Sequence, residues 1–367
     1  MTLIFQIKRY IFKPQLPADN KDNPMKKQKN LLFIITLLFF SGCMVNPVTL
    51  EQEFNIVSEE KELRIGRNAH KQIVRQFGFY YDTAFQQYVN QIGQNMARVS
   101  RRRDITYHFT ILDDDMKNAF AIPGGYIYIT RGLLSLLNNE AELAGVLAHE
   151  VGHVAGRDSA ALMSQGMIAQ LATVAGIAGA AATSSGDAAL AANQLFNALM
   201  LGFSREKEYL SDQQAVEYLM KTGYDPLQMV SFMYSLSHIS QGPTGAQGYL
   251  VTHPYIFDRI ARIEAKYKVM VAMNKTMGQL HNRNEEDYSH RGKIYAERYK
   301  SYLNGLAYGP RDDIRHIKLY TVRRGDTLPL IARRTLGSSV KARILAELNG
   351  IPASTQLIPG ATIKIIY

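Results

Sequence analysis

The sequence of 367 residues contains no tryptophan and a single cysteine, Cys43. One cysteine cannot form a disulfide within the chain, so a disulfide-rich scaffold is excluded. Helix-turn-helix, RNP and zinc-finger patterns are also missing, and we therefore expect no nucleic-acid partner. The hydrophobic content of 46% is that of an ordinary globular protein, and the length allows a sizeable core and a second small module.

An apolar run near the N-terminus, residues 31–40, is too short to be a spanning helix. A basic stretch that begins at Met25 precedes this run, and Ser41-Gly42-Cys43 closes it. This order of parts is typical of a secretory signal. The ending resembles that of bacterial lipoprotein signals, which implies cleavage before Cys43 and acylation of that residue. Because Met44 follows instead of aspartate, we expect a periplasmic protein that is anchored by its lipid to the outer membrane. Met25 is the better candidate for the true start.

The positive charge of the chain is moderate once this signal is removed. Residues 1–42 hold seven basic and two acidic residues, so their loss lowers the formal net charge from +10 to +5. This excess suits an envelope surface rich in anionic lipid and cell-wall polymer.

Residues 149–153 read His-Glu-Val-Gly-His inside a stretch, 141–154, that predicts a buried helix. At about 3.6 residues per turn, His149 and His153 share one helix face and can bind one metal ion. Glu150 lies beside that face, where its carboxylate can accept a proton from a water polarised by the metal. The alternative is a pair of ordinary histidines on a core helix. The uncharged flanks favour a metal site.

A catalytic zinc site uses a third protein ligand and leaves the fourth position to water. A third histidine six residues after His153 is excluded, because that position is Ser159. A glutamate from a later helix is the other solution, and residues 204–212 supply candidates. Glu208 and Asp212 share a helix face, so one can bind the metal while the other accepts an N–H from a ligand histidine. Glu206 competes, but it points elsewhere on that helix.

Four stretches together resemble a known family: residues 118–130, 149–153 and 204–212, and Thr252-His253-Pro254-Tyr255 with Arg259. They occur in the order found in zinc metallopeptidases related to HtpX and the CAAX prenyl protease. The similarity is greatest to the periplasmic lipoprotein branch, which includes the beta-barrel assembly-enhancing protease. It covers about residues 52–267.

The resemblance implies one zinc ion per chain, bound by His149, His153 and Glu208. Glu150 is then the general base, and Asp212 orients a ligand histidine. The implied reaction is hydrolysis of peptide bonds in unfolded or misassembled envelope proteins.

The same resemblance implies that His253 and Arg259 face the substrate and stabilise the oxyanion. His253 could instead occupy the fourth zinc position and inhibit the enzyme. Ser211 stands where the family has alanine, a small change that leaves the ligand assignment unaltered.

Residues 119–130 have the pattern of a strand, but Pro123 in its middle cannot donate to a ladder. We therefore expect an edge strand or a bend. Beside a zinc site, an edge strand offers its backbone to an extended peptide. A plain connecting hairpin is the alternative, and the resemblance favours a substrate-binding edge with these residues: Asn118, Ala119, Phe120 and Ala121.

Residues 159–186 contain no charged side chain, and the next charge along the chain is Asp187. A membrane hairpin is one interpretation, but Gln165, Gln170 and Thr173 argue against burial in lipid. A helical hairpin or moving lid beside the cleft is preferred.

The last fifty residues resemble a LysM domain, a β-α-α-β module whose family binds N-acetylglucosamine-containing glycans. The resemblance implies peptidoglycan as a partner, although Pro329 departs from the usual pattern. A structural or protein-docking module is the alternative.

The expected fold class is α+β: a mainly helical zincin of the gluzincin type with a small sheet, followed by the β-α-α-β module. The expected divisions are 1–42 (extension and signal), 43–267 (metallopeptidase), 268–317 (helical linker) and 318–367 (LysM-like). Two other functions remain: a non-catalytic chaperone or scaffold bound to peptidoglycan, and a cell-wall hydrolase.

Overall fold

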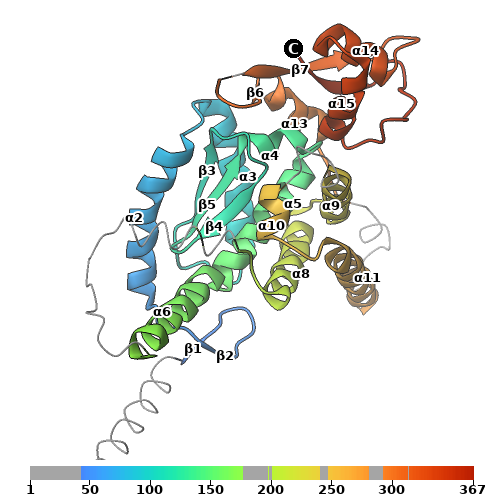
Figure 1. Ribbon diagram of the computed structural model, residues 1–367. Coiled ribbons are helices and arrows are strands. Elements are labelled where there is room, and N and C mark those ends of the chain that lie inside the picture. Colours follow the sequence, from blue (N-terminus) through green and yellow to red (C-terminus); the bar gives the residue numbers. More distant parts are fainter. Residues whose placement is uncertain (1–42, 177–196, 198–200, 240–246, 281–291, 313) are drawn as a thin grey trace, which may run out of the picture. The chain divides into compact units, whose positions relative to one another are not determined.

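Helices surround a three-stranded sheet in the computed structural model, which describes residues 43–176, 197, 201–239, 247–280, 292–312 and 314–367 (Figure 1). The α+β class expected from the sequence is confirmed. A short hairpin, β1 (Cys43–Val45) with β2 (Gln52–Phe54), opens the described chain. Contacts gather residues 44–367 into one unit.

The central sheet has the order β3-β5-β4. Strand β3 (His108–Leu112) runs parallel to β5 (Tyr126–Thr130), and β4 (Ala119–Ile122) pairs antiparallel with β5. The bend expected at Pro123 is a tight turn: Pro123, Gly124 and Gly125 divide residues 119–130 into two strands, as in the hairpin that was the alternative. Both glycines have positive φ, 83° and 88°. The edge position expected for this segment belongs to β4.

Side chains alternate across this sheet, as strand geometry requires, and so create two apolar layers. One face, with Phe120 and Tyr128, packs against helix α2 (Glu59–Phe77). The other face, with Ala121 and Ile129, packs against α3 (Thr83–Val99) and α5 (Glu140–Ala155). The sheet is thus enclosed by helices on both sides (Figure 1).

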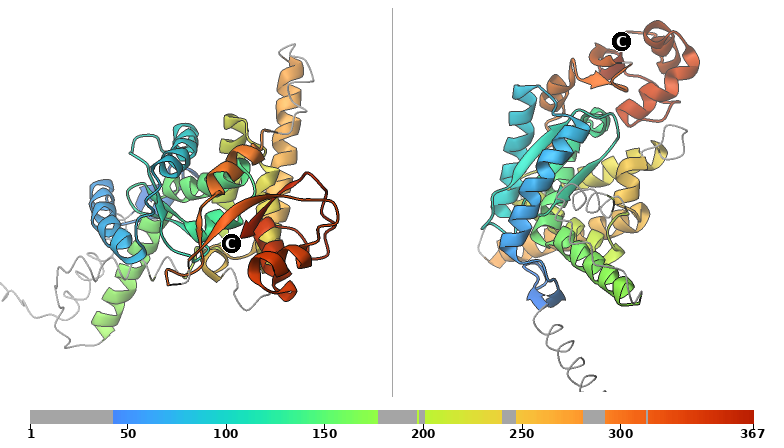
Figure 2. Two further views of the ribbon diagram at one scale, coloured as in Figure 1. Left: turned by 90° about the horizontal axis from the view of Figure 1, so that it is seen from above. Right: turned by 60° about the vertical axis from the view of Figure 1, so that its left-hand side comes forward.

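Helix α5 is buried along its whole length, which explains its lack of a polar face. It begins at a side-chain cap, because the Asn139 side chain accepts a hydrogen bond from the Glu142 amide. Further helices of the described chain follow or flank it, and α11 projects beyond its neighbours (Figure 2). They are α4 (Arg131–Leu136), α6 (Asp158–Gly176), α8 (Arg205–Thr222), α9 (Leu227–Ile239), α10 (Gln247–Thr252) and α11 (Ile256–Leu280).

Helix α6 forms the first part of the uncharged stretch, and residues 177–186 of the expected hairpin or lid fall outside the described chain. Among the residues that the structure describes, no helix has both the length and the apolar character needed to cross a membrane.

The C-terminal module has the expected β-α-α-β order: β7 (Arg315–Thr321), α14 (Leu328–Leu336), α15 (Ala342–Asn349) and β8 (Thr362–Ile366). Strand β8 pairs antiparallel with β7, and β6 (Ala307–Tyr308) extends that sheet. The module has a small apolar core of its own.

This module is also anchored on the larger part of the protein. Lys364 of β8 is fully buried, and its ammonium donates hydrogen bonds to the carbonyls of Ser135, Leu136 and Leu137 at the end of α4. The expected linker contains a packed helix, α13 (Ala296–Leu303), whose Tyr299 hydroxyl donates to the Leu134 carbonyl.

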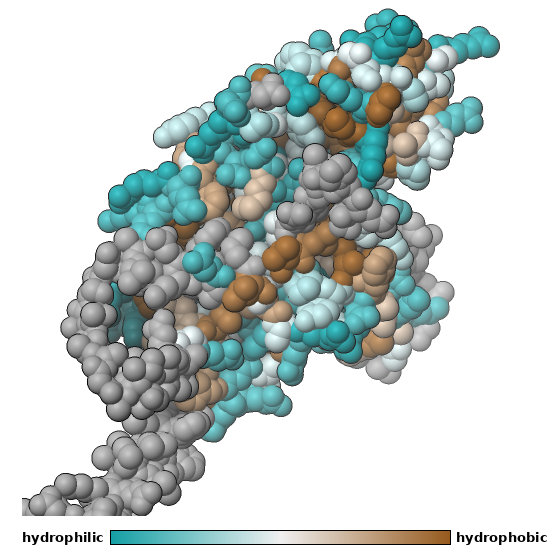
Figure 3. Space-filling view, in the orientation of Figure 1, coloured by the Kyte–Doolittle hydropathy of each residue, from teal (hydrophilic) through white to brown (hydrophobic). Residues whose placement is uncertain are grey.

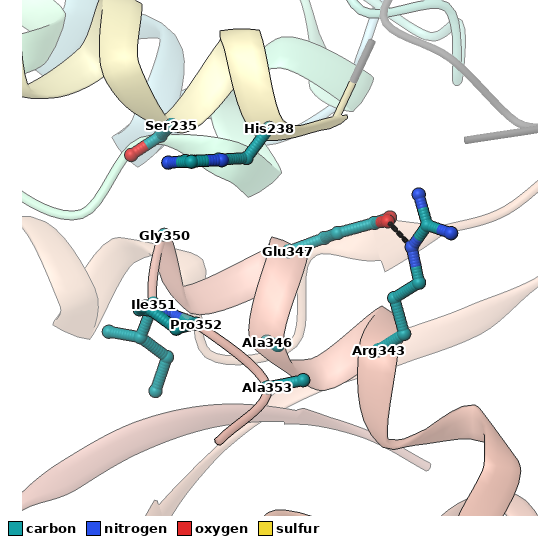
Figure 4. Close-up of a pocket in the computed structure, with 9 residues that line it drawn as sticks. All are labelled: Ser235, His238, Arg343, Ala346, Glu347, Gly350, Ile351, Pro352 and Ala353. Atoms are coloured by element: carbon teal, nitrogen blue, oxygen red, sulfur yellow. Dashed lines mark hydrogen bonds and ion pairs between the residues drawn. The ribbon is translucent and has the colours of Figure 1, made fainter. Parts of the chain in front are cut away.

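A cavity of about 360 Å³ separates α9 from α15. Figure 4 shows Ser235 and His238 of α9 on one side and the Arg343–Glu347 ion pair of α15 on the other. Gly350 brings the two sides together, because a Cβ there would lie 2.7 Å from the Ser235 hydroxyl.

Candidate metal centre

Helix α5 presents His149 and His153 from the same face, as the four-residue spacing predicts. Their Nε2 atoms lie 3.0 Å apart, and both rings are buried. With Glu208 and His253 they form a group whose ligand atoms all lie within 4.8 Å of one another. The expected ligands therefore meet at one point.

Helix α8 supplies the acidic partner because it crosses α5 closely. A Cβ at Gly152 would lie 3.0 Å from the Ser211 Cα, so glycine permits this approach. Glu208 Oε1 lies 3.3 Å from His153 Nε2, and its Oε2 lies 3.5 Å from His149 Nε2. Glu206, the competing candidate, is exposed to solvent.

Asp212 lies on the opposite side of the first histidine. Its Oδ1 is 2.9 Å from His149 Nδ1, which is the outer nitrogen of that ring. A carboxylate in this place fixes the tautomer and orientation of a ligand histidine. The two acids on one face of α8 thus take different positions: Glu208 faces the inner nitrogens, and Asp212 faces an outer one.

Asp158 holds the second histidine in the same manner, and the sequence did not single it out. Its Oδ2 lies 2.8 Å from His153 Nδ1, and the Ser211 hydroxyl is 3.0 Å from the same nitrogen. The chain reaches this point through Arg157, which has a left-handed backbone with φ of 55°. Because this contact depends on that turn, helix periodicity could not reveal it. In the sequence, the only sign of this role was the position of Asp158 directly before the uncharged residues 159–186.

Glu150 lies at the metal centre with its side chain fully buried. Its Oε1 is 3.3 Å from His253 Nε2, yet neither carboxylate oxygen accepts a hydrogen bond from the residues that the structure describes. Burial raises the pKa of this carboxyl group above its ordinary value. A proton acceptor that lacks a donor suits a general base awaiting a water molecule.

His253 stands directly over the other two histidines. Its Nδ1 is 3.3 Å from His149 Nε2 and 3.2 Å from Glu208 Oε1. Its Nε2 lies 3.3 Å from the carbonyl oxygen of Ala119. The side chain therefore lies where a fourth ligand would be, between the metal ligands and the edge strand.

Arg259 lies among the acidic side chains of the centre. Its guanidinium forms a bidentate ion pair with Asp212, in which Nε and Nη2 each donate to one carboxylate oxygen at 2.8 Å. Its Nη1 lies 2.8 Å from Glu208 Oε2. Nη1 also donates to the His253 carbonyl at 3.2 Å. The side chain is thus buried behind the ligands and does not face an open cleft. In this arrangement it positions the two acids.

The edge strand lies beside this centre, but its outward carbonyls have partners. The Thr130 amide bonds the Asn118 carbonyl, so Ala119 and Ala121 present their backbone groups away from β5. The Ala119 carbonyl faces His253, and the Ala121 carbonyl accepts a hydrogen bond from the Ser159 hydroxyl at 2.9 Å. Phe120 points into the layer beneath α2.

The donor set fits a divalent metal ion. Two imidazoles and a carboxylate are the ligands of one large class of catalytic zinc sites. Burial opposes a charged His153, yet Asp158 and Glu208 raise its pKa to about 10, so these two acids favour positive charge at the site. Burial likewise opposes ionisation of Glu208, but Arg259 and His253 hold its pKa well below the ordinary value.

Hydrophobic side chains gather on the surface around α10 (Figure 3). Leu201, Val251 and Phe257 are 84%, 53% and 66% exposed. Gly202 lets the backbone beside Leu201 approach Val251 closely, since a Cβ at Gly202 would lie 2.8 Å from the Val251 carbonyl. These side chains flank the segment that carries His253.

A metallopeptidase of the zincin type is the class that this helix, its histidines and the acid on α8 define. Residues 83–267 match peptidase family M48, and residues 320–365 match the LysM domain. The chain belongs to peptidase family M48, whose members depend on a metal.

Curated relatives agree with this assignment. The mitochondrial metalloendopeptidase OMA1 of Schizosaccharomyces pombe is 29% identical over 233 residues, which cover 62% of this chain and 67% of that protein. The beta-barrel assembly-enhancing protease of Yersinia pestis is 28% identical over 56% of this chain and 43% of its own length. A protease HtpX homolog of Aeropyrum pernix is 37% identical over 27% of this chain and 37% of its length. The chain thus spans less than half the length of the latter two.

Proposed function

We propose that this metallopeptidase is a zinc-dependent endopeptidase of the bacterial cell envelope that degrades unfolded or misassembled envelope proteins. The convergence of His149, His153 and Glu208 beside Glu150 carries the proposal. Two nitrogens and one carboxylate oxygen are ligands that zinc accepts in a tetrahedral site with one open position.

A bound zinc ion would polarise the attacking water and the scissile carbonyl. Glu150 accepts the proton of that water and then donates it to the leaving amine. Its burial supports this role, because a carboxyl group with a raised pKa gives up a proton less readily than an exposed one. Asp212 and Asp158 hold the two histidines in the required orientation.

Substrate access requires a change at His253. Its ring lies where it could serve as a fourth metal ligand, and it contacts the Ala119 carbonyl, so an extended peptide would reach β4 only after the ring moves. Once displaced, its imidazole can assist the oxyanion. The exposed Leu201, Val251 and Phe257 beside this segment suit substrates whose apolar side chains are accessible, as in unfolded proteins.

We propose that Cys43 carries the lipid anchor, that the anchor lies in the outer membrane, and that the LysM domain contacts peptidoglycan. The name of the Yersinia relative supports an envelope role. Replacing Cys43 with serine should release the protein from the membrane fraction, whereas retention there would contradict the anchor.

Metal analysis together with hydrolysis of an unfolded protein tests the proposal. Glu208→Ala should lose zinc, whereas Glu206→Ala, which removes an exposed acid from the same helix, should retain it. Glu150→Gln should keep zinc and lose about a hundredfold or more of the hydrolysis rate. Full zinc occupancy in Glu208→Ala would contradict the ligand assignment. Release of cell-wall fragments with the unfolded protein left intact would contradict the substrate class.

A further inference from the structure

A second cavity, of about 280 Å³, lies where the M48 region meets the C-terminal module. Its walls come from the loop between β3 and β4, from α4, from β6 and β7, and from α15. These elements meet near the C-terminal module (Figure 1). None of its lining residues belongs to the metal centre. An occupant would contact both matched regions of the chain at once.

Arg131 lines this cavity with an incompletely paired guanidinium. The side chain is 1% exposed, its Nε lies 2.6 Å from Asp113 Oδ1, and its Nη1 donates to the Ala307 carbonyl. The third nitrogen, Nη2, is buried and has no hydrogen-bond acceptor among the described residues. Leaving such a donor unsatisfied is costly in a folded protein, and an acceptor supplied by a ligand removes that cost.

Two more donors in the same cavity lack partners. The ammonium of Lys117 makes no hydrogen bond or ion pair within the described part of the chain, and burial lowers its pKa. The Tyr308 hydroxyl is likewise without a hydrogen bond there, and burial raises its pKa, so it remains a donor. Arg315 also lines the cavity.

The cavity also contains two acidic residues, Asp115 and Glu347, whose charges partly offset the effect of burial on the pKa of Lys117. Asp115 is exposed to solvent, and Glu347 is already paired with Arg343 at 2.8 Å. The cavity between α9 and α15 provides a contrast, because its arginine is the one in that ion pair (Figure 4). The arginine of that cavity is therefore already paired with an anion.

We propose that the cavity lined by Lys117, Arg131 and Tyr308 binds a carboxylate-bearing ligand about the size of one or two amino-acid residues. A carboxylate has two oxygens that can accept from these three donors. The volume lies near the lower end of the range for small-molecule sites.

This chemistry has two sources in an envelope, namely the free C-terminus of a peptide and the carboxylates of cell-wall peptides. Calorimetric titration distinguishes them with three probes: an acetylated dipeptide with a free C-terminus, its C-terminal amide, and soluble muropeptides. The protein carries Glu150→Gln so that the probes remain intact. We expect the dipeptide acid or the muropeptides to bind and the amide to fail. Equal binding of acid and amide, or binding of inorganic phosphate alone, would overturn the proposal.

Two variants test the donors without disturbing Arg131, which also stabilises the fold through Asp113. Lys117→Met should weaken binding about tenfold or more, and Tyr308→Phe should weaken it several-fold, because each removes one donor. Lys71→Met is the matched control, since that lysine is exposed on α2 and is not part of the cavity lining. Unchanged affinity in Lys117→Met would show that the cavity is not the binding site.

Discussion

Replacement of Asp158 by asparagine tests whether the metal is held by more than its direct ligands. The carboxylate is 3% exposed, and its Oδ2 accepts from His153 Nδ1 at 2.8 Å. Asparagine has nearly the same volume but no charge, so the ring keeps a neighbour yet loses the anion that orients it and raises its basicity. Lys207, which lies 3.1 Å from the other oxygen, retains Glu53 at 2.8 Å and is not left unpaired.

Partners of this kind typically change metal affinity by about 10- to 100-fold, or about 1.4–2.7 kcal/mol. We expect a loss of zinc affinity within that range, measured by competition with a chromophoric chelator. Asp258→Asn is the matched control, because it makes the same change on a carboxylate that is 55% exposed. Equal zinc affinity in Asp158→Asn and the unaltered protein would refute the positioning role.

Three further predictions concern metal removal, the β4–β5 turn and the docking of the LysM domain. Chelation should lower the melting temperature, because a ligand present at a thousand times its dissociation constant contributes about 4 kcal/mol to folding; a calorimetric scan without a shift would contradict a structural contribution of the metal. Gly125→Ala should destabilise by about 1–3 kcal/mol in urea unfolding, since φ is 88° and a Cβ would lie 2.4 Å from the Thr106 carbonyl. Gly305→Ala is the control for backbone strain alone, because its φ is 93° but its Cβ would meet open space. An equal loss of stability in Gly305→Ala would show that the contact with the Thr106 carbonyl contributes nothing to the effect at Gly125. Lys364→Met should cost about 1–3 kcal/mol in the same assay, because three carbonyls of α4 and its C-terminal end lose their donor. Lys318→Met changes an exposed residue of β7 and should have little effect on stability. Equal losses of stability in the two variants would contradict a stabilising role for the contact between Lys364 and α4.

The local patterns of the sequence were sufficient for the parts of the centre that lie on single helices. His149 and His153 are four residues apart, as are Glu208 and Asp212, and helix geometry alone puts each pair on one face. The Asn139 cap and the order of the LysM elements follow from equally local rules. Which acid would face the inner nitrogens was left open by spacing, and the crossing of α5 and α8 places Glu208 there.

Contacts between distant segments depend on how the elements pack, and periodicity carries no information about them. The left-handed turn at Arg157 returns Asp158 to His153, and the packing of α11 against α8 places Arg259 between Asp212 and Glu208. Residues 119–130 carry the residue types of one strand, but two consecutive positive-φ glycines divide it into a hairpin. Short-range geometry thus determined which residues could act on a metal, whereas only tertiary packing decided which atoms of those residues meet.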